Sequence, residues 1–199
     1  RNMRLFRDYK LDAYLHQRSS ALETEIRNLS LSEIKAKDDE ELVQQLLAKY
    51  KVTAPILDET NLDIEVHEAT VQVRDQFSSR FDRGGVVSVP GHSITIRVSF
   101  SGPGELFKCT PSTWSPSGTP DADIESGNLV LRYETTEKDP EKIKSLWKND
   151  LGVIGQNLGW IEKDLAGYNA SLVSNLRAAL TKRKKEAEES KSLIDKLKG

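Results

Sequence analysis

The chain has 199 residues, of which 30% are charged and 37% hydrophobic, and its formal net charge is −2. This length suits one elongated domain or two small ones, and the small net charge excludes a whole-protein field that would attract nucleic acid or an anionic membrane. The single cysteine, Cys109, excludes an internal disulfide framework and fits a reducing compartment. No apolar run approaches the roughly 18 residues of a membrane span, so we expect a cytoplasmic protein.

Residues 1–52 are predicted to form a helical segment. Apolar side chains between residues 8 and 29 fall at helical spacing, at Leu11, Leu15, Leu22, Ile26 and Leu29. Residues 30–37 are interpreted as a linker. Asp38, with Glu41 three residues later, has the pattern of a capping box and predicts a short helix that ends near Tyr50. We expect both helices to pack against the C-terminal part of the chain.

Residues 53–136 are predicted to form an antiparallel β-unit, because the apolar period changes to two. Leu62, Ile64 and Val66 alternate with polar residues, which indicates a half-buried strand. We expect a bulge at Glu68-Ala69 and the end of a strand at Pro90-Gly91. The clearest alternation follows at Ile94, Ile96, Val98 and Phe100.

The second part of this β-unit has weaker signals. Residues 106–109 are predicted to be extended, residues 110–123 to form a surface loop, and residues 129–133 to form a last strand after the Gly127-Asn128 turn. Five or six strands within about 80 residues favour one antiparallel sheet or a small sandwich.

Residues 139–199 are predicted to form a long helical arm. Asp139 as N-cap and Pro140 at the first helical position give a strong start signal. A heptad stripe then follows at Trp147, Leu151, Ile154, Leu158, Ile161, Leu165, Tyr168 and Leu172. Such a stripe has to be covered by another helix, a second copy of the chain or a sheet. A bend expected at Tyr168-Asn169 would divide the arm into a pair of helices.

Three of the four glycines before residue 170 in this helical pattern lie close together, at Gly152, Gly155 and Gly159. Each costs about 1 kcal/mol relative to alanine in a helix. A helix keeps such residues where a neighbour packs closely against its backbone, so we expect a contact face. The alternative is a frayed or kinked first segment. The complete prediction is an α+β fold, with a sheet or sandwich flanked by N-terminal helices and a C-terminal helical pair.

The sequence contains no motif for a catalytic, cofactor or metal site. His16, His67 and His92 lack the spacing of zinc ligands, and Cys109 is expected to be a buried apolar residue. The strand carboxylates available to a metal-dependent hydrolase or nuclease are Asp63, Glu65 and Glu134. A basic run is available to a nucleic-acid-binding module, at Lys182, Arg183, Lys184 and Lys185. The acidic residues directly after that run favour a solvated helix face.

Two short patterns carry a resemblance. They are Gly102-x-x-Glu105-Leu106-Phe107 followed by Pro111-Ser112, and Tyr168-Asn169-x-x-Leu172 followed by Arg183-Lys184. Over roughly the last 100 residues, the chain resembles an uncharacterised N-terminal module of bacterial multidomain proteins that carry a separate C-terminal effector, TIR-like or restriction-endonuclease-like. Pro103 departs from the acidic residue of that pattern. The resemblance implies a sensing or assembly role and supplies no catalytic residues.

These observations predict a non-enzymatic binding or oligomerisation module, whose partner is a second copy or an attached effector domain. The candidate interaction residues are Trp147, Leu151, Ile154, Leu158, Gly155, Gly159, Trp114 and Phe107. The metal-dependent enzyme and the nucleic-acid-binding module stay open as alternatives. Met3 is expected to be the native start. The helical pattern that runs into Gly199 indicates a fragment of a longer protein, or a complete protein that ends on a helix.

Overall fold

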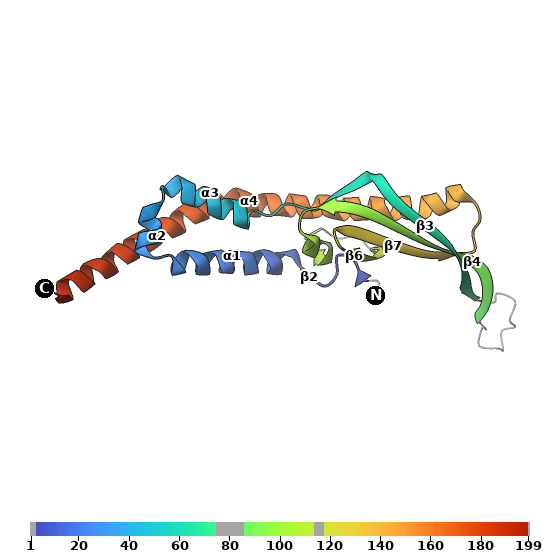
Figure 1. The fold of residues 1–199 in the computed structure, drawn as a ribbon, viewed down its shortest axis with the longest axis horizontal. Helices are drawn as coiled ribbons and strands as arrows, with labels where there is room; N and C mark the ends of the chain where they lie inside the picture. The colour runs from blue at the N-terminus through green and yellow to red at the C-terminus, as the bar shows by residue number, and fades with distance from the viewer. Residues whose placement is uncertain (1–2, 75–85, 114–117, 199) are drawn as a thin grey trace.

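One long helix organises the molecule, and the other elements lie along it (Figure 1). The computed structural model describes residues 3–74, 86–113 and 118–198. The long helix is α4 (Pro140–Lys198). The remaining elements are β1 (Met3–Arg4), β2 (Tyr9–Lys10), α1 (Leu11–Asn28), α2 (Leu31–Ala36), α3 (Asp39–Tyr50), β3 (Ile56–Arg74), β4 (Val86–Ser101), the 3₁₀-helix η1 (Gly104–Lys108), β5 (Cys109–Thr110), β6 (Asp121–Glu125) and β7 (Asn128–Thr135). The predicted α+β class is confirmed.

The main sheet has five strands in the order β1-β6-β7-β4-β3, and its strands pair antiparallel. β2 and β5 form a separate, short parallel pair. The strands β1 and β2 lie in the segment predicted to be helical, and β6 lies partly in the predicted loop. Two-residue strands carry too little periodicity to be recognised in a sequence. In β6, Ala122 and Ile124 do alternate with acidic residues, but the turn formers before them favoured a loop.

The N-terminal helices include one that the sequence analysis missed. Residues 31–36 form helix α2, where a linker was predicted. The complete capping box is at Ser30 and Glu33, because the Ser30 hydroxyl accepts from the Glu33 N–H and the Ser30 N–H donates to the Glu33 carboxylate at 2.7 Å. Asp38 is the N-cap residue of α3, but its side chain makes no capping hydrogen bond. The capping-box prediction therefore fell on the wrong residue pair.

The strands β3 and β4 form one long hairpin with two unexpected features. The irregularity in pairing lies between Asp58 and Leu62, and pairing is regular through Glu68 and Ala69, where the bulge was predicted. β4 also continues through Pro90 and Gly91. This is possible because β7 ends at Thr135, opposite His92, so the missing Pro90 N–H lies beyond the last residue of that neighbour.

Gly91 is required at the point where the hairpin extends past β7. A Cβ atom built on Gly91 would lie 2.6 Å from the Thr135 carbonyl oxygen and 2.6 Å from a methyl group of Val71. Both distances are shorter than van der Waals contact, and the oxygen belongs to backbone. A larger residue at this position would force the outer part of the hairpin away from the end of β7.

Helix α4 begins as predicted and is continuous, so the predicted bend and the helical pair are wrong. Asp139 caps it, accepting from the Glu141 N–H at 3.0 Å. Asn169 does not compete with its own helix. Its side-chain amide donates to the Val52 carbonyl at 2.7 Å and its side-chain oxygen accepts from the Val52 N–H at 3.1 Å. The polar group that suggested a bend instead fastens the segment after α3 to α4.

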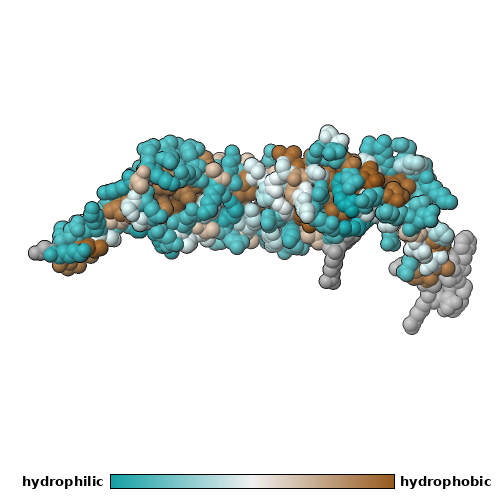
Figure 2. Space-filling model, in the orientation of Figure 1, coloured by the Kyte–Doolittle hydropathy of each residue, from teal (hydrophilic) through white to brown (hydrophobic). Residues whose placement is uncertain are grey.

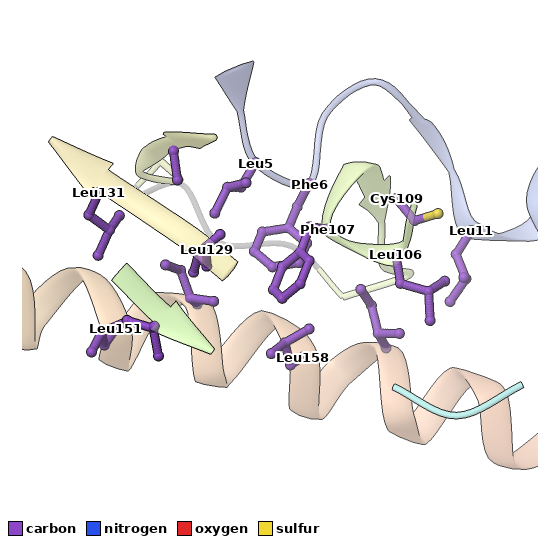
Figure 3. Packing of buried hydrophobic residues seen from close by; sticks show 14 of the residues in the cluster. Leu5, Phe6, Leu11, Leu106, Phe107, Cys109, Leu129, Leu131, Leu151 and Leu158 are labelled. Carbon is purple, nitrogen blue, oxygen red and sulfur yellow. The ribbon is translucent and has the colours of Figure 1, made fainter. Parts of the chain in front are cut away.

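Two hydrophobic cores cover successive parts of the stripe on α4. The first lies between the sheet and α4 and contains the N-terminal segment and η1 (Figure 3). The second lies between α4 and the helices α1 and α3. It is formed by Leu22, Ile26, Leu42, Val43, Leu46, Tyr50, Leu172, Leu176 and Leu180. The predicted packing between helices from the two ends of the chain is confirmed.

Candidate interaction surface

The apolar stripe on α4 is used inside the chain. Leu151, Ile154 and Leu158 are buried beneath the sheet, and Trp147 is half-buried. The sheet covers this part of the stripe, so no second copy is needed to remove these leucines and isoleucines from water. A surface that contacts a partner therefore has to lie beside the stripe.

Phe107 also belongs to the core. It is fully buried, with its ring 5.0 Å from that of Phe100 and 6.2 Å from that of Phe6 (Figure 3). The Phe6 N–H donates to the Phe107 carbonyl, which ties the N-terminal segment to η1. Residues 106–109 were predicted to be a strand, but 106–108 are 3₁₀-helical and turn both Leu106 and Phe107 inward. Trp114 lies outside the described residues.

Gly152, Gly155 and Gly159 of α4 face open space. Apart from the nearby backbone of the helix itself, no atom of the described residues lies within 4 Å of a Cβ built on any of them, and all three are exposed. Nothing described in the chain packs against them, so the predicted contact face stays a prediction and would have to meet a partner, while the alternative of a frayed segment does not fit the continuous helix α4. These glycines thin one side of α4 and leave its backbone accessible.

Two grooves lie between α4 and the strand β3 with the segment before it. The edge groove, of about 530 Å³, is lined by Ile64, Val66, Pro140, Ile143 and Trp147, with Lys138 and Lys144 among its polar residues. The glycine groove, of about 560 Å³, is lined by residues 52–57, Gly155, Gly159 and Ala166. The edge groove thus lies beside β3, and the glycine groove lies mainly beside the segment that precedes it.

The side chains beside these grooves leave unusual apolar area in water. Ile56 is 70% exposed, Ile64 48% and Val66 56%. Figure 2 shows hydrophobic surface over the first turns of α4 and near the start of β3, with a separate patch at the C-terminal end of α4. That separate patch, here called the free end, contains Leu193, Ile194 and Leu197. Adjoining apolar side chains at a groove are typical of a contact site, whereas scattered ones are ordinary.

The opposite face of the sheet is charged and internally paired. Arg97 contacts both Asp63 and Glu65 at 3.0 Å, and Arg132 contacts Asp123 and Glu125. The hydrogen bond and charge of Arg97 hold the pKa of Glu65 below its ordinary value. Glu134 lies on β7, which β4 separates from β3. The three carboxylates proposed for a hydrolase therefore do not converge.

Within residues 3–74, 86–113 and 118–198, no three His, Cys, Asp or Glu side chains gather in a way that could hold a metal ion. Cys109 is buried, and this burial raises the pKa of its thiol to about 11. A protonated thiol is a poor nucleophile.

The basic run on α4 contacts the end of α1, the start of α3 and its own helix. The Arg183 guanidinium donates two hydrogen bonds, of 3.0 and 2.8 Å, to the Leu29 carbonyl at the end of α1. Lys184 contacts Asp39 at 2.7 Å. Lys182 and Lys185 lie 3.9 Å from Glu186 and Glu189 on their own helix. Arg183 and Lys184 thus hold α1 and α3 to α4, an arrangement that does not favour a phosphate-binding surface.

Comparisons of the chain with protein-family models, with curated proteins and with solved structures find no match. Among the helices of the described residues, none combines the length and the apolar character that a membrane crossing requires. The surface itself therefore has to indicate the function. Sequence reasoning missed the edge groove because alternation placed Ile64 and Val66 on the core face without showing that their strand lies at the edge.

Proposed function

We propose that this chain is a non-enzymatic binding and oligomerisation module whose contact surface is the side of the molecule where β3 extends past α4. The single observation that carries this proposal is the row of exposed apolar side chains on β3, Ile56, Ile64 and Val66, beside the edge groove and the glycine groove. Covering apolar area releases about 25 cal/mol for each Å² removed from water.

Two further observations support the non-enzymatic part of the proposal. Asp63 and Glu65, on the open face of the sheet, are engaged by Arg97. The thiol of Cys109 is buried and its pKa is raised. Carboxylates held by an ion pair and a buried, protonated thiol stabilise the surface and the core, and neither is placed to react with a substrate. The role that the resemblance implies, as the sensing or assembly part of a larger bacterial protein, belongs to the same proposal, with an attached effector domain as a further partner.

Sedimentation velocity over a wide range of protein concentration tests the oligomerisation. We expect the mean mass to rise with concentration, and to rise at least as much in high salt, because salt screens ion pairs but does not weaken apolar contact. A strict monomer at the highest concentration would contradict the oligomerisation. Mass that falls back to monomer in high salt would assign association to charged residues instead of these grooves.

The non-enzymatic part has its own test. The wild type and the variants Asp63→Ala and Glu65→Ala are assayed for hydrolysis of nucleic acid and phosphate esters with Mg²⁺, Mn²⁺ and Zn²⁺. We expect no turnover by any of the three proteins. Turnover by the wild type that both variants lose would refute the proposal in favour of a metal-dependent hydrolase.

A further inference from the structure

The strand β3 is the edge of the five-stranded sheet. Its 19 residues pair with β4 on one side, and no strand among the described residues pairs with its other side. An edge of this kind presents a row of N–H and C=O groups to which another strand can bond. This inference rests on the proposed function and assigns the partner and the geometry of the contact.

The ladder shows which backbone groups of β3 face outward. In an antiparallel ladder each residue directs its N–H and C=O to one side, and successive residues alternate. The Phe100 N–H donates to the Gly127 carbonyl at 3.0 Å, so the even-numbered residues of β4 face β7 and the odd-numbered ones face β3. Asp63 and Glu65 lie opposite odd-numbered residues of β4 and bond inward. The outward groups are those of Leu62, Ile64, Val66 and Glu68.

The same residues carry the side chains on the helix side of the sheet. Ile64 and Val66 pair with Ile96 and Ile94 of β4, which are buried in the core, yet both are about half exposed and line the edge groove. One added strand would therefore satisfy the backbone and cover the side chains at the same edge. It would bond to the free backbone edge, and its own side chains would cover Ile64 and Val66.

We propose that this strand is β3 of a second copy of the chain, paired antiparallel about a twofold axis at Val66. The two five-stranded sheets then form one continuous sheet with both α4 helices on the same face. In this register Val66 lies opposite Val66 of the second copy, and Glu65 lies opposite His67 of the second copy, twice. A pair of exposed valines and two acid–histidine pairs are favourable cross-strand neighbours.

Neighbouring registers are less favourable. An axis at Ile64 sets Asp63 opposite Glu65 of the second copy, and an axis at Glu65 sets two glutamates directly opposite each other. Like charges in these positions destabilise a strand pair. A shift by one residue sets the apolar face of one strand beside the polar face of the other, so it leaves Ile64 and Val66 uncovered.

The edge groove adds a charge match on the helix side. With the axis at Val66, Glu68 of the second copy lies opposite Ile64, on the face where Lys138 and Lys144 line the groove. The exposed Glu68 carboxylate then lies on the side of the groove with Lys138 and Lys144, while the Glu137 carboxylate that also lines the groove is engaged by Lys142. The acid–histidine pairs on the open face and the opposite charges on the helix side together select a second copy in this register over an unrelated strand.

The test compares edge variants by sedimentation velocity. Val66→Pro removes the outward N–H without breaking the ladder to β4, and we expect it to weaken self-association on the order of tenfold or more at unchanged circular dichroism. Val66→Ile keeps the N–H, the β-branched shape and the apolar side chain and is expected to associate like the wild type. Leu193→Ser with Leu197→Ser is the control at the free end.

A crosslinking pair fixes the register. In the proposed pairing the two Val66 Cα atoms are about 5.5 Å apart, so Val66→Cys is expected to give dimers with a short bis-maleimide. Gln72→Cys is the control, because the same register places its two copies roughly 40 Å apart at about 3.3 Å per residue. Cys109 is buried in both variants. This pair decides the question even where Val66→Pro unfolds.

The outcomes separate this inference from the proposed function. A wild type that never associates refutes the oligomerisation itself. If the wild type associates and Val66→Pro associates equally well, the β3 pairing is overturned while the oligomerisation stands. The same holds if Gln72→Cys crosslinks as well as Val66→Cys. Association lost only in the Leu193→Ser, Leu197→Ser variant moves the contact to the free end of α4 and also overturns the pairing.

Discussion

The two halves of α4 carry the same kind of apolar stripe but are covered by different structures. In the first half, Ile154 and Ile161 lie under the sheet, whereas in the second half Leu172 and Leu176 lie between α1 and α3. A sheet on one side leaves the rest of the helix open, so the glycines of the first half are exposed. A heptad stripe therefore specifies that a helix face is buried and does not specify which element buries it.

The largest effects should separate these halves. Ile154→Ala and Leu176→Ala each remove a fully buried side chain, and each should lower the free energy of unfolding by about 2–5 kcal/mol. By hydrogen exchange, Ile154→Ala should loosen β4 and β7 first, and Leu176→Ala should loosen α1 and α3. Leu193→Ala, at an exposed site, is the control. Equal loosening everywhere would show that the halves form one cooperative unit.

The junction between the halves should give the next largest effect. Asn169 is bonded through both side-chain atoms to the Val52 peptide, so Asn169→Ala leaves two partly buried backbone groups without those partners. We expect a loss of about 1–3 kcal/mol in urea denaturation. Asn157→Ala is the matched control, because buried Asn157 donates to the Val153 carbonyl of its own helix, its one side-chain hydrogen bond within the part of the chain that the structure describes. Equal losses in both variants would refute a special role for the junction.

The packing of α1 on the second half of α4 depends on a contact at the end of α1. Arg183 satisfies the Leu29 carbonyl at the end of α1 with two hydrogen bonds. Arg183→Lys keeps the charge but loses the planar fork, and it should cost about 1–2 kcal/mol in urea denaturation. Lys182→Ala, at an exposed position, should stay within about 0.5 kcal/mol. An unchanged stability in Arg183→Lys would show that apolar packing alone holds the end of α1 to α4.

The sequence predicted the α+β class and the helices because their signals are local and long. Asp139 and Pro140 mark the start of α4 on their own, and the stripe persists over many turns. The errors fell where a distant neighbour decides. Asn169 indicated a bend, but its side chain bonds to the Val52 peptide and not to its own helix. Pro90 indicated a strand end, but β7 ends before it reaches Pro90. The edge groove depends on strand order, which no local pattern contains.

On the exposed side of the first half of α4, we expect substitutions that raise the free energy of unfolding. Gly155→Ala and Gly159→Ala fill open space on a helix, so each should raise the free energy of unfolding of the monomer by about 0.5–1 kcal/mol. Gly91→Ala is the contrasting variant and should destabilise, because its methyl group would overlap the Thr135 carbonyl. Thermal unfolding at low protein concentration measures all three. A lower midpoint in Gly155→Ala would mean that a neighbour does pack there.

The smallest predicted effect is the pH dependence that Glu25 adds to the packing of α1 against α3. Glu25 on α1 accepts hydrogen bonds from Lys49 and Tyr50 at the end of α3. These bonds lower the pKa of the Glu25 carboxyl, while burial and Glu25 raise the pKa of Tyr50 to about 12.

A carboxyl with a lowered pKa in the folded state stabilises above its unfolded value, near 4.5, and this stabilisation is lost as the pH falls through the folded pKa. The partly exposed pair is worth about 0.5 kcal/mol. The unfolding midpoint of Glu25→Gln should therefore lie below that of the wild type at pH 7, and the two should converge below pH 4.5. A gap that persists in acid would show that Glu25 acts by packing and not by charge.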